Sequence, residues 1–126
     1  MNFPENLKYT KDHEWILVEG STGTVGITEF AQSELGDIVF IEVETIGDEL
    51  SMGDAFGTIE AVKTVSDMFM PASGKVAEFN NKLMDQPEVI NKDPYGEGWI
   101  IKISISNPAE LDGLLDHNQY KNLVEG

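Results

Sequence analysis

Cysteine and arginine are both absent from the 126 residues of this chain, and no apolar run approaches the length that crosses a membrane. The lack of cysteine excludes disulfides, thiolate metal sites and cysteine nucleophiles. Eight lysines face 23 acidic residues, which gives a net charge of −15. Because binding to phosphates depends on Lys and Arg, we expect no nucleic-acid partner. The acidic surface either steers the protein towards basic partner surfaces or serves solubility alone.

Signals for export and for catalysis are also missing. Residues 1–7 (MNFPENL) have neither the basic start nor the apolar core of a signal peptide. We therefore expect a cytoplasmic protein if Met1 is the true start; a protein of the mitochondrial matrix whose transit peptide had been removed would look similar. His13 and His117 lie far apart in sequence, and neither a Ser-His-Asp arrangement nor an Asp-rich calcium loop occurs. We expect no catalytic residues and no metal site.

Short apolar segments between glycine-rich turns predict a mainly β fold, in a single domain over residues 1–126, of small barrel or sandwich type. Residues 15–18 and 24–27 read as an N-terminal hairpin. Thr28 is suited to cap a short helix over residues 29–35, because its hydroxyl can accept from an otherwise unpaired amide. Gly36 would end this helix.

Further strands follow at close spacing. Residues 37–44 alternate, and we expect the wholly apolar face formed by Val39, Ile41 and Val43 to point into the core. Residues 75–79 are predicted to form another strand. Residues 99–105, the most β-rich segment of the chain, are predicted to be a central strand. The polar stretch between them is long enough for a functional or partly helical loop.

The C-terminal region predicts two helices. Asn107 is a candidate cap, with Pro108 at the first helical position and Leu111, Leu114 and Leu115 spaced as one apolar stripe. Asp116 is suited to cap a second helix through residue 123, and we expect this helix to bury both Tyr120 and Leu123.

The segment around Lys63 is the most informative one. This lysine stands in an apolar, β-favouring run that Gly53-Asp54 precedes and Pro71-Ala-Ser-Gly74 follows. Both clusters predict turns, which places Lys63 where two short strands meet, at a hairpin tip. The residues at the tip lack the Asn-Gly or Asp-Gly pair of tight hairpins, so the pattern also allows one continuous strand with an ordinary solvated lysine.

Several motifs together resemble a known family. The sequence around Lys63 (EAVK, residues 60–63, and PASGKV, residues 71–76) is similar to biotinyl and lipoyl carrier domains. Further segments resemble the H proteins of the glycine cleavage system, in order and at the expected spacing from about Tyr9 to Tyr120: YTKDHEW (9–15), VGIT (25–28), LGDI (35–38) and DPYGEGW (93–99). The resemblance implies a flattened barrel-sandwich hybrid whose Lys63 carries lipoate through an amide bond.

The resemblance also implies a function, which is that of a non-catalytic shuttle. The lipoyl arm would take the aminomethyl group from the glycine decarboxylase (the pyridoxal-phosphate-dependent P protein) to the aminomethyltransferase (T protein). Dihydrolipoyl dehydrogenase (L protein) would then reoxidise it. A lipoate ligase or transferase would attach the cofactor. A monomer suits such a shuttle.

The same resemblance implies functional roles for four other residues. Glu60 and Asp67 flank the lysine and could be recognised by the ligase or the partners, or could keep an exposed hairpin soluble. His13 and Glu14 are expected to shelter the loaded arm in a surface cleft, with Glu14 accepting its ammonium. The alternative for Glu14 is a solvent-facing position on the strand before Trp15.

Other functions stay open at this stage. One is an H-like carrier that mainly relays lipoate to other enzymes, and another is an unmodified interaction protein that uses the acidic surface alone. A biotin carrier is less favoured, because Val62 and Thr64 stand where methionines usually flank the biotinyl lysine.

Overall fold

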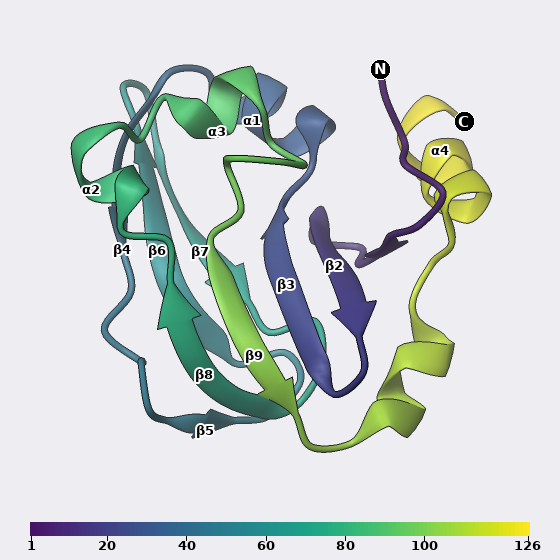
Figure 1. The fold of residues 1–126 in the computed structure, drawn as a ribbon. Helices are drawn as coiled ribbons and strands as arrows, with labels where there is room; N and C mark the ends of the chain where they lie inside the picture. Colours follow the sequence, from purple (N-terminus) through teal and green to yellow (C-terminus); the bar gives the residue numbers. More distant parts are fainter.

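The computed structural model describes residues 1–126 as two antiparallel β-sheets with short helices at their margins (Figure 1). The larger sheet has the strand order β1-β2-β3-β9-β8-β5 and the smaller one the order β4-β6-β7. The strands are β1 (Lys8–Tyr9), β2 (Glu14–Glu19), β3 (Thr22–Ile27), β4 (Ile38–Glu42), β5 (Glu49–Leu50), β6 (Ala55–Ala61), β7 (Val65–Phe69), β8 (Gly74–Phe79) and β9 (Ile101–Ile105). The helices are α1 (Glu29–Leu35), α2 (Lys82–Asp85), α3 (Val89–Lys92), the 3-10 helix η1 (Pro108–Gly113) and α4 (His117–Glu125).

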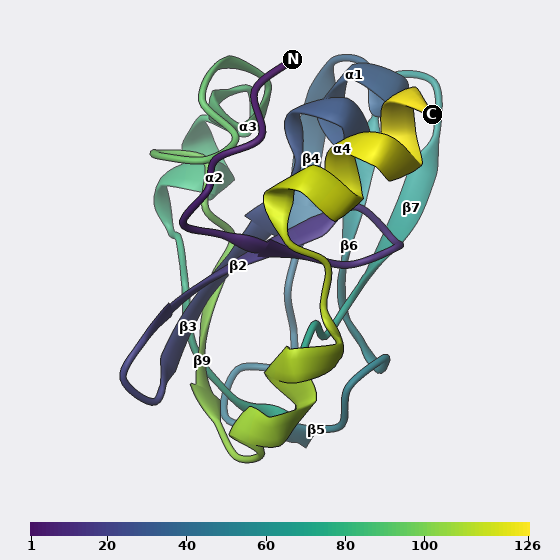
Figure 2. The ribbon, with the colours of Figure 1, turned by 90° about the vertical axis from the view of Figure 1, so that its right-hand side faces the viewer.

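The two sheets face each other across the main core, which contains 19 buried residues. Figure 2 shows the smaller sheet on one side and strands β2, β3 and β9 on the other, with α4 crossing the end of the molecule. Alternating strand residues supply this core, for example Val25 and Ile103 from the larger sheet and Ile59 from the smaller one. The prediction of a mainly β, sandwich-like fold is confirmed.

The N-terminal hairpin and the helix after it form as their local sequence predicts. Strands β2 and β3 pair from Glu14 opposite Ile27 to Glu19 opposite Thr22. Thr28 caps α1, its Oγ1 accepting a hydrogen bond from the Ala31 amide at 3.1 Å. Gly36 ends the helix with φ 84°, a conformation that glycine adopts without steric cost.

The prediction for the buried face of β4 is confirmed for Ile41 and for the partly buried Val43, but it was wrong for Val39. Ile38 and Ile41 are 3% and 1% exposed, whereas Val39 and Phe40 are 46% and 41% exposed. The pairing of β4 with β6 shifts register between Ile38 and Phe40, which is the signature of a β-bulge. The extra residue puts Ile38 and Ile41 on the same face, so a strict alternation of two does not apply here.

The long polar loop before β9 braces the end of α1. Its Asn91 side chain accepts a hydrogen bond from the Ile38 amide at 3.0 Å and donates to the Gly36 carbonyl at 2.9 Å. The loop is partly helical, because it contains α2 and α3. Strand β9 lies between β3 and β8, in the interior of the larger sheet as predicted.

The first C-terminal helix is a 3-10 helix, and Asn107 makes no capping hydrogen bond through its side chain. The carboxylate of Glu110 instead accepts hydrogen bonds from the Ser73 amide at 2.7 Å and the Ser73 hydroxyl at 2.9 Å. Leu111 and Leu114 are both buried, since a spacing of three residues also fits one turn of a 3-10 helix.

Helix α4 begins at the predicted cap, where Asp116 and Gln119 form a capping box. Tyr120 is fully buried and stacks on Tyr9 with ring centroids 4.7 Å apart, whereas Leu123 is 48% exposed, contrary to the prediction. No helix in the structure is long and apolar enough to cross a membrane.

Candidate functional site

Lys63 lies at the tip of the hairpin formed by β6 and β7, as one of the two sequence interpretations predicts. Glu60 pairs with Val65 at the ends of the strands, and the Ala61 amide donates to the Thr64 carbonyl at 2.8 Å to close the turn. The lysine is exposed, and the one salt bridge of the structure joins two other residues. Its amine is therefore presented to solvent without an ionic partner.

The stem of Lys63 lies over the end of α1. A Cβ atom placed on Gly36 would approach its Cε to 3.3 Å, so the absence of a side chain at position 36 makes room for the stem. Leu35, the neighbour of Gly36 in the chain, lines a surface cleft of about 300 Å³. The hairpin tip thus lies beside one end of this cleft.

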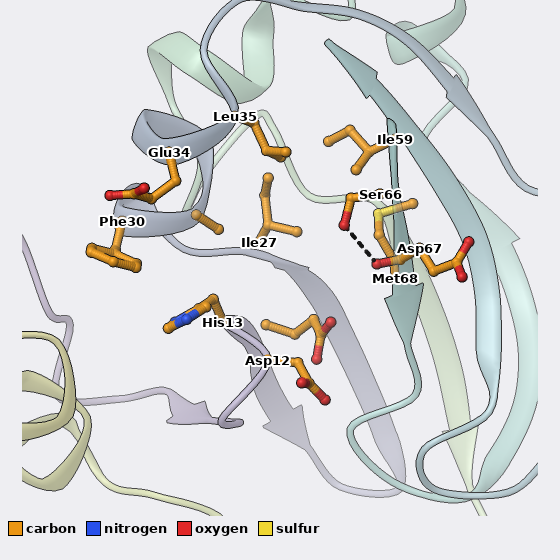
Figure 3. Close-up of a pocket in the computed structure, with 12 residues that line it drawn as sticks. Asp12, His13, Ile27, Phe30, Glu34, Leu35, Ile59, Ser66, Asp67 and Met68 are labelled. Atoms are coloured by element: carbon orange, nitrogen blue, oxygen red, sulfur yellow. Dashed lines mark hydrogen bonds between the residues drawn. The ribbon is translucent and has the colours of Figure 1, made fainter. Parts of the chain in front are cut away.

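The cleft lies between α1 and the β6–β7 hairpin (Figure 3). Apolar side chains from four elements, β3, α1, β6 and β7, form its walls, and carboxylates and a histidine lie towards its other end. The lining residues are Asp12, His13, Glu14, Ile27, Phe30, Ala31, Glu34, Leu35, Ile59, Ser66, Asp67 and Met68. This composition suits a flexible apolar chain with a cationic end.

Glu14 is the most deeply placed charged group of the cleft. It is 2% exposed, which rejects the solvent-facing alternative. Its Oε1 accepts a hydrogen bond from the Thr10 hydroxyl at 2.7 Å and its Oε2 one from the Phe69 amide at 3.2 Å. Burial raises the pKa of Glu14 to about 7, against the opposing effect of these two donors. The carboxyl can therefore change charge near neutral pH in response to what occupies the cleft.

His13 occupies a strained turn that the C-terminal helix supports. Its φ is 68°, the one positive value outside glycine. Nδ1 lies 2.8 Å from the hydroxyl of Tyr120, which is also 2.7 Å from Oγ1 of Thr28. The imidazole packs against the ring of Phe30, with centroids 4.8 Å apart. Burial lowers the pKa of His13, although the charges of nearby carboxylates act in the opposite direction.

The structure brings together only part of the predicted site. His13 and Glu14 share the cleft, and Asp67 contributes to its lining, yet Figure 3 shows the Asp67 carboxylate directed away from the cleft. Glu60 is exposed on the hairpin and does not line the cleft. Whether Glu60 or Asp67 is recognised by a partner stays a prediction.

Sequence reasoning missed the contribution of α1 to the cleft. Phe30, Glu34 and Leu35 line it from this helix, and Ile59 and Met68 from the hairpin strands. These residues come from separate elements, so no local pattern could group them. The structure has no group of three or more His, Asp or Glu side chains able to hold a metal ion.

The buried carboxyl makes a testable contribution to stability. Because the native state raises the pKa of Glu14 from 4.5 to about 7, it favours the protonated form. The contribution of this carboxyl to the free energy of unfolding is fully present below its unfolded-state pKa. It is lost as the pH rises through its native-state pKa. Relative to Glu14→Gln, we expect the free energy of unfolding of the native sequence to fall by ~3 kcal/mol between about pH 5 and pH 8.

Chemical denaturation of both proteins across this pH range measures that difference. Glu19→Gln, at an exposed position at the end of β2, is the matched control and should follow the native sequence. Parallel pH profiles for the native sequence and Glu14→Gln would contradict the assigned environment of Glu14.

The family model, the similar sequences and the similar solved structure described below all point to one family. Residues 7–126 match the family model described as glycine cleavage H-protein. A glycine cleavage system H protein of Symbiobacterium thermophilum is 61% identical over 119 residues, covering 94% of this chain and 93% of the relative. Another, of Bacteroides thetaiotaomicron, is 54% identical over 126 residues and covers 100% of both chains. The crystal structure of a glycine cleavage system H protein from Mycobacterium marinum has a TM-score of 0.82 at 37% identity, covering 94% of this chain and 96% of that one.

Proposed function

The chain belongs to the glycine cleavage H-protein family, whose members are lipoyl carriers and not catalysts, and we propose on that premise that it carries lipoate amide-linked to Lys63. The observation that supports this most is the exposed, unpaired Lys63 at the tip of a hairpin, beside a cleft suited to an arm. We further propose that residues 1–126 act as a single carrier domain and as a monomer in the cytoplasm.

The bond-forming step of the attachment uses one reactive group of the chain, the accessible amine of Lys63. Nζ of Lys63 would attack the carboxyl carbon of an activated lipoyl donor, forming the amide bond, expelling the activating group and releasing a proton. The lysine loses its charge and becomes the base of a long flexible arm. Tethering then converts each visit to a partner's active site into an encounter at high effective concentration, on the order of millimolar for short flexible links.

The cofactor supplies the redox and group-transfer chemistry. We propose that the arm takes the aminomethyl group from the glycine decarboxylase to the aminomethyltransferase and is then reoxidised by dihydrolipoyl dehydrogenase. A lipoate ligase or transferase attaches the cofactor. The chain's own task is to present the arm to these enzymes and to protect what it carries.

The cleft is the proposed resting place of the loaded arm. An aminomethyl adduct carries an amine, which is protonated at neutral pH and labile when exposed to water. The apolar walls near Leu35 would pack the chain of the arm, and Glu14 would accept the ammonium at the other end. A bound cation favours the ionised form of Glu14, so the carboxyl would gain its charge as the arm docks.

A partial reaction tests the proposed function. With a glycine decarboxylase, glycine and labelled bicarbonate, the lipoylated chain should support exchange of label into the glycine carboxyl group. The same chain without lipoate is the matched control and should give no exchange above background. Equal exchange from both forms would contradict the proposal, as would no exchange from the lipoylated form with a decarboxylase active on other H proteins.

A further inference from the structure

The outer face of the smaller sheet presents an ordered set of side chains next to Lys63. The register pairs Phe40 with Glu60 and Glu60 with Val65, so these three side chains lie in one row across β4, β6 and β7. The row nearest the tip therefore has an apolar residue on each side of a carboxylate.

Four exposed apolar side chains surround the lysine, and we name them the apolar tip: Val39, Phe40, Val62 and Val65. Val62 and Val65 are 75% and 62% exposed, the two highest values among the large apolar residues. The bulge in β4 turns Val39 and Phe40 outwards, and the Val62 amide donates to the Asp37 carbonyl at 3.0 Å, which holds the tip against the start of β4. A contiguous patch of exposed apolar side chains is typical of an interaction surface.

An acidic hollow lies further along the same outer face. The next row of the register is Glu42, Thr58 and Asp67, and a depression of about 210 Å³ opens there. Three carboxylates line this depression, those of Glu42, Glu44 and Asp67, and we name it the acidic hollow. Figure 3 shows the Asp67 carboxylate directed away from the cleft, and Asp67 also lines the hollow. No basic residue lines the hollow.

Building on the proposed function, we infer that the apolar tip and the acidic hollow together form the docking surface for the enzyme that acylates Lys63. That enzyme must bring its active site to Nζ of Lys63 itself. It must then cover Val62 and Val65, which lie one and two positions away. The enzymes that receive the finished arm can act at the distance of its length, so they need not cover the tip.

The chemistry of the surface defines the partner's face. Apolar side chains there would bury the apolar tip, and an Arg or Lys would enter the acidic hollow. Arg is the better match, because its planar guanidinium can contact two carboxylates at once. The net charge of −15 adds long-range attraction to such a basic face, which raises the association rate and makes it sensitive to salt.

Two double variants separate the parts of the surface. The substrate is the unmodified chain, the probe is a lipoate ligase with lipoate and ATP, and KM and kcat for the chain are measured. We expect Val62→Ser with Val65→Ser to raise KM about tenfold with kcat little changed, because burial of two apolar side chains is lost. We expect Glu42→Gln with Glu44→Gln to raise KM several-fold and to weaken its dependence on salt.

Matched controls carry the same changes elsewhere. Leu123→Ser removes an apolar side chain that is 48% exposed on α4, and Glu19→Gln with Glu125→Gln removes two charges away from the hairpin. Both controls should keep the native KM. Because every substituted side chain is exposed, all variants should keep the native unfolding midpoint, which is measured in parallel.

The outcomes are distinguishable. An unchanged KM in both double variants, with the native chain lipoylated normally, would overturn the docking surface and leave the proposed function standing. An effect seen only in the glycine decarboxylase assay would assign the surface to that enzyme and also overturn the inference. Failure of the native chain to accept lipoate at all would instead reject the proposed function and this inference with it.

Discussion

Lys63→Arg is expected to abolish lipoylation and, with it, all activity of the chain in a reconstituted glycine cleavage system. Arginine keeps the positive charge and the length of the side chain, yet its guanidinium stays protonated and does not form the amide. The side chain is exposed at the hairpin tip and makes no salt bridge, so the fold should not change. Lipoate incorporation and glycine-dependent exchange should both fall to background, with an unaltered unfolding midpoint.

Lys75→Arg, on an exposed position of β8, is the matched control for this change. It should be lipoylated and active at native levels. Full activity of Lys63→Arg would favour the alternative in which the chain is an unmodified interaction protein. Loss of activity in both variants would point to a general effect of arginine and not to the attachment site.

Glu14→Gln should leave lipoylation intact but speed the loss of the aminomethyl group from the loaded arm. The substitution keeps the size of the side chain and an acceptor for the Phe69 amide, and removes only the charge that faces the ammonium. Hydrogen bonds to charged groups contribute about 1.5–3 kcal/mol, which corresponds to roughly 10- to 100-fold faster release. Release of methylamine or its hydrolysis products from the loaded protein measures the rate.

Glu14→Ala should release the group at least as fast, but it would also leave the Phe69 amide without its acceptor. Glu19→Gln, at an exposed position outside the cleft, should release at the native rate. If Glu14→Gln and the native protein released the group equally fast, Glu14 would not hold the loaded arm.

Local chemistry is what made much of the fold predictable. The helix between Thr28 and Gly36 forms where a hydroxyl cap and a glycine stop predict it, and Asp116 caps α4 as expected. The hairpin at Lys63 could be chosen over a continuous strand only through the resemblance to carrier domains. The comparisons confirm this resemblance at the level of the family.

The wrong predictions share a physical cause. Contacts between elements distant in sequence override the spacing of apolar residues along the chain. The bulge in β4 depends on its pairing with β6, so the alternation of residues 37–44 gave the wrong side for Val39. At Leu111 and Leu114, a spacing of three fits both an α-helix and a 3-10 helix, and the contact of Glu110 with Ser73 accompanies the second.

The candidate site was predictable in its chemistry but not in its assembly. His13 and Glu14 adjoin each other in sequence, yet the burial of Glu14 depends on contacts with Phe69, a residue 55 positions away. The part of α1 in the cleft and the outward turn of Asp67 also depend on how the two sheets pack. No pattern along the chain carries that information.

One measurement tests the central claim most directly: the intact mass of the protein from its native cells, followed by peptide mapping across residues 57–75. Our account predicts a mass increase equal to one lipoyl group, located on Lys63. An unmodified Lys63 throughout the sample, in cells whose other lipoyl proteins are fully modified, would contradict it.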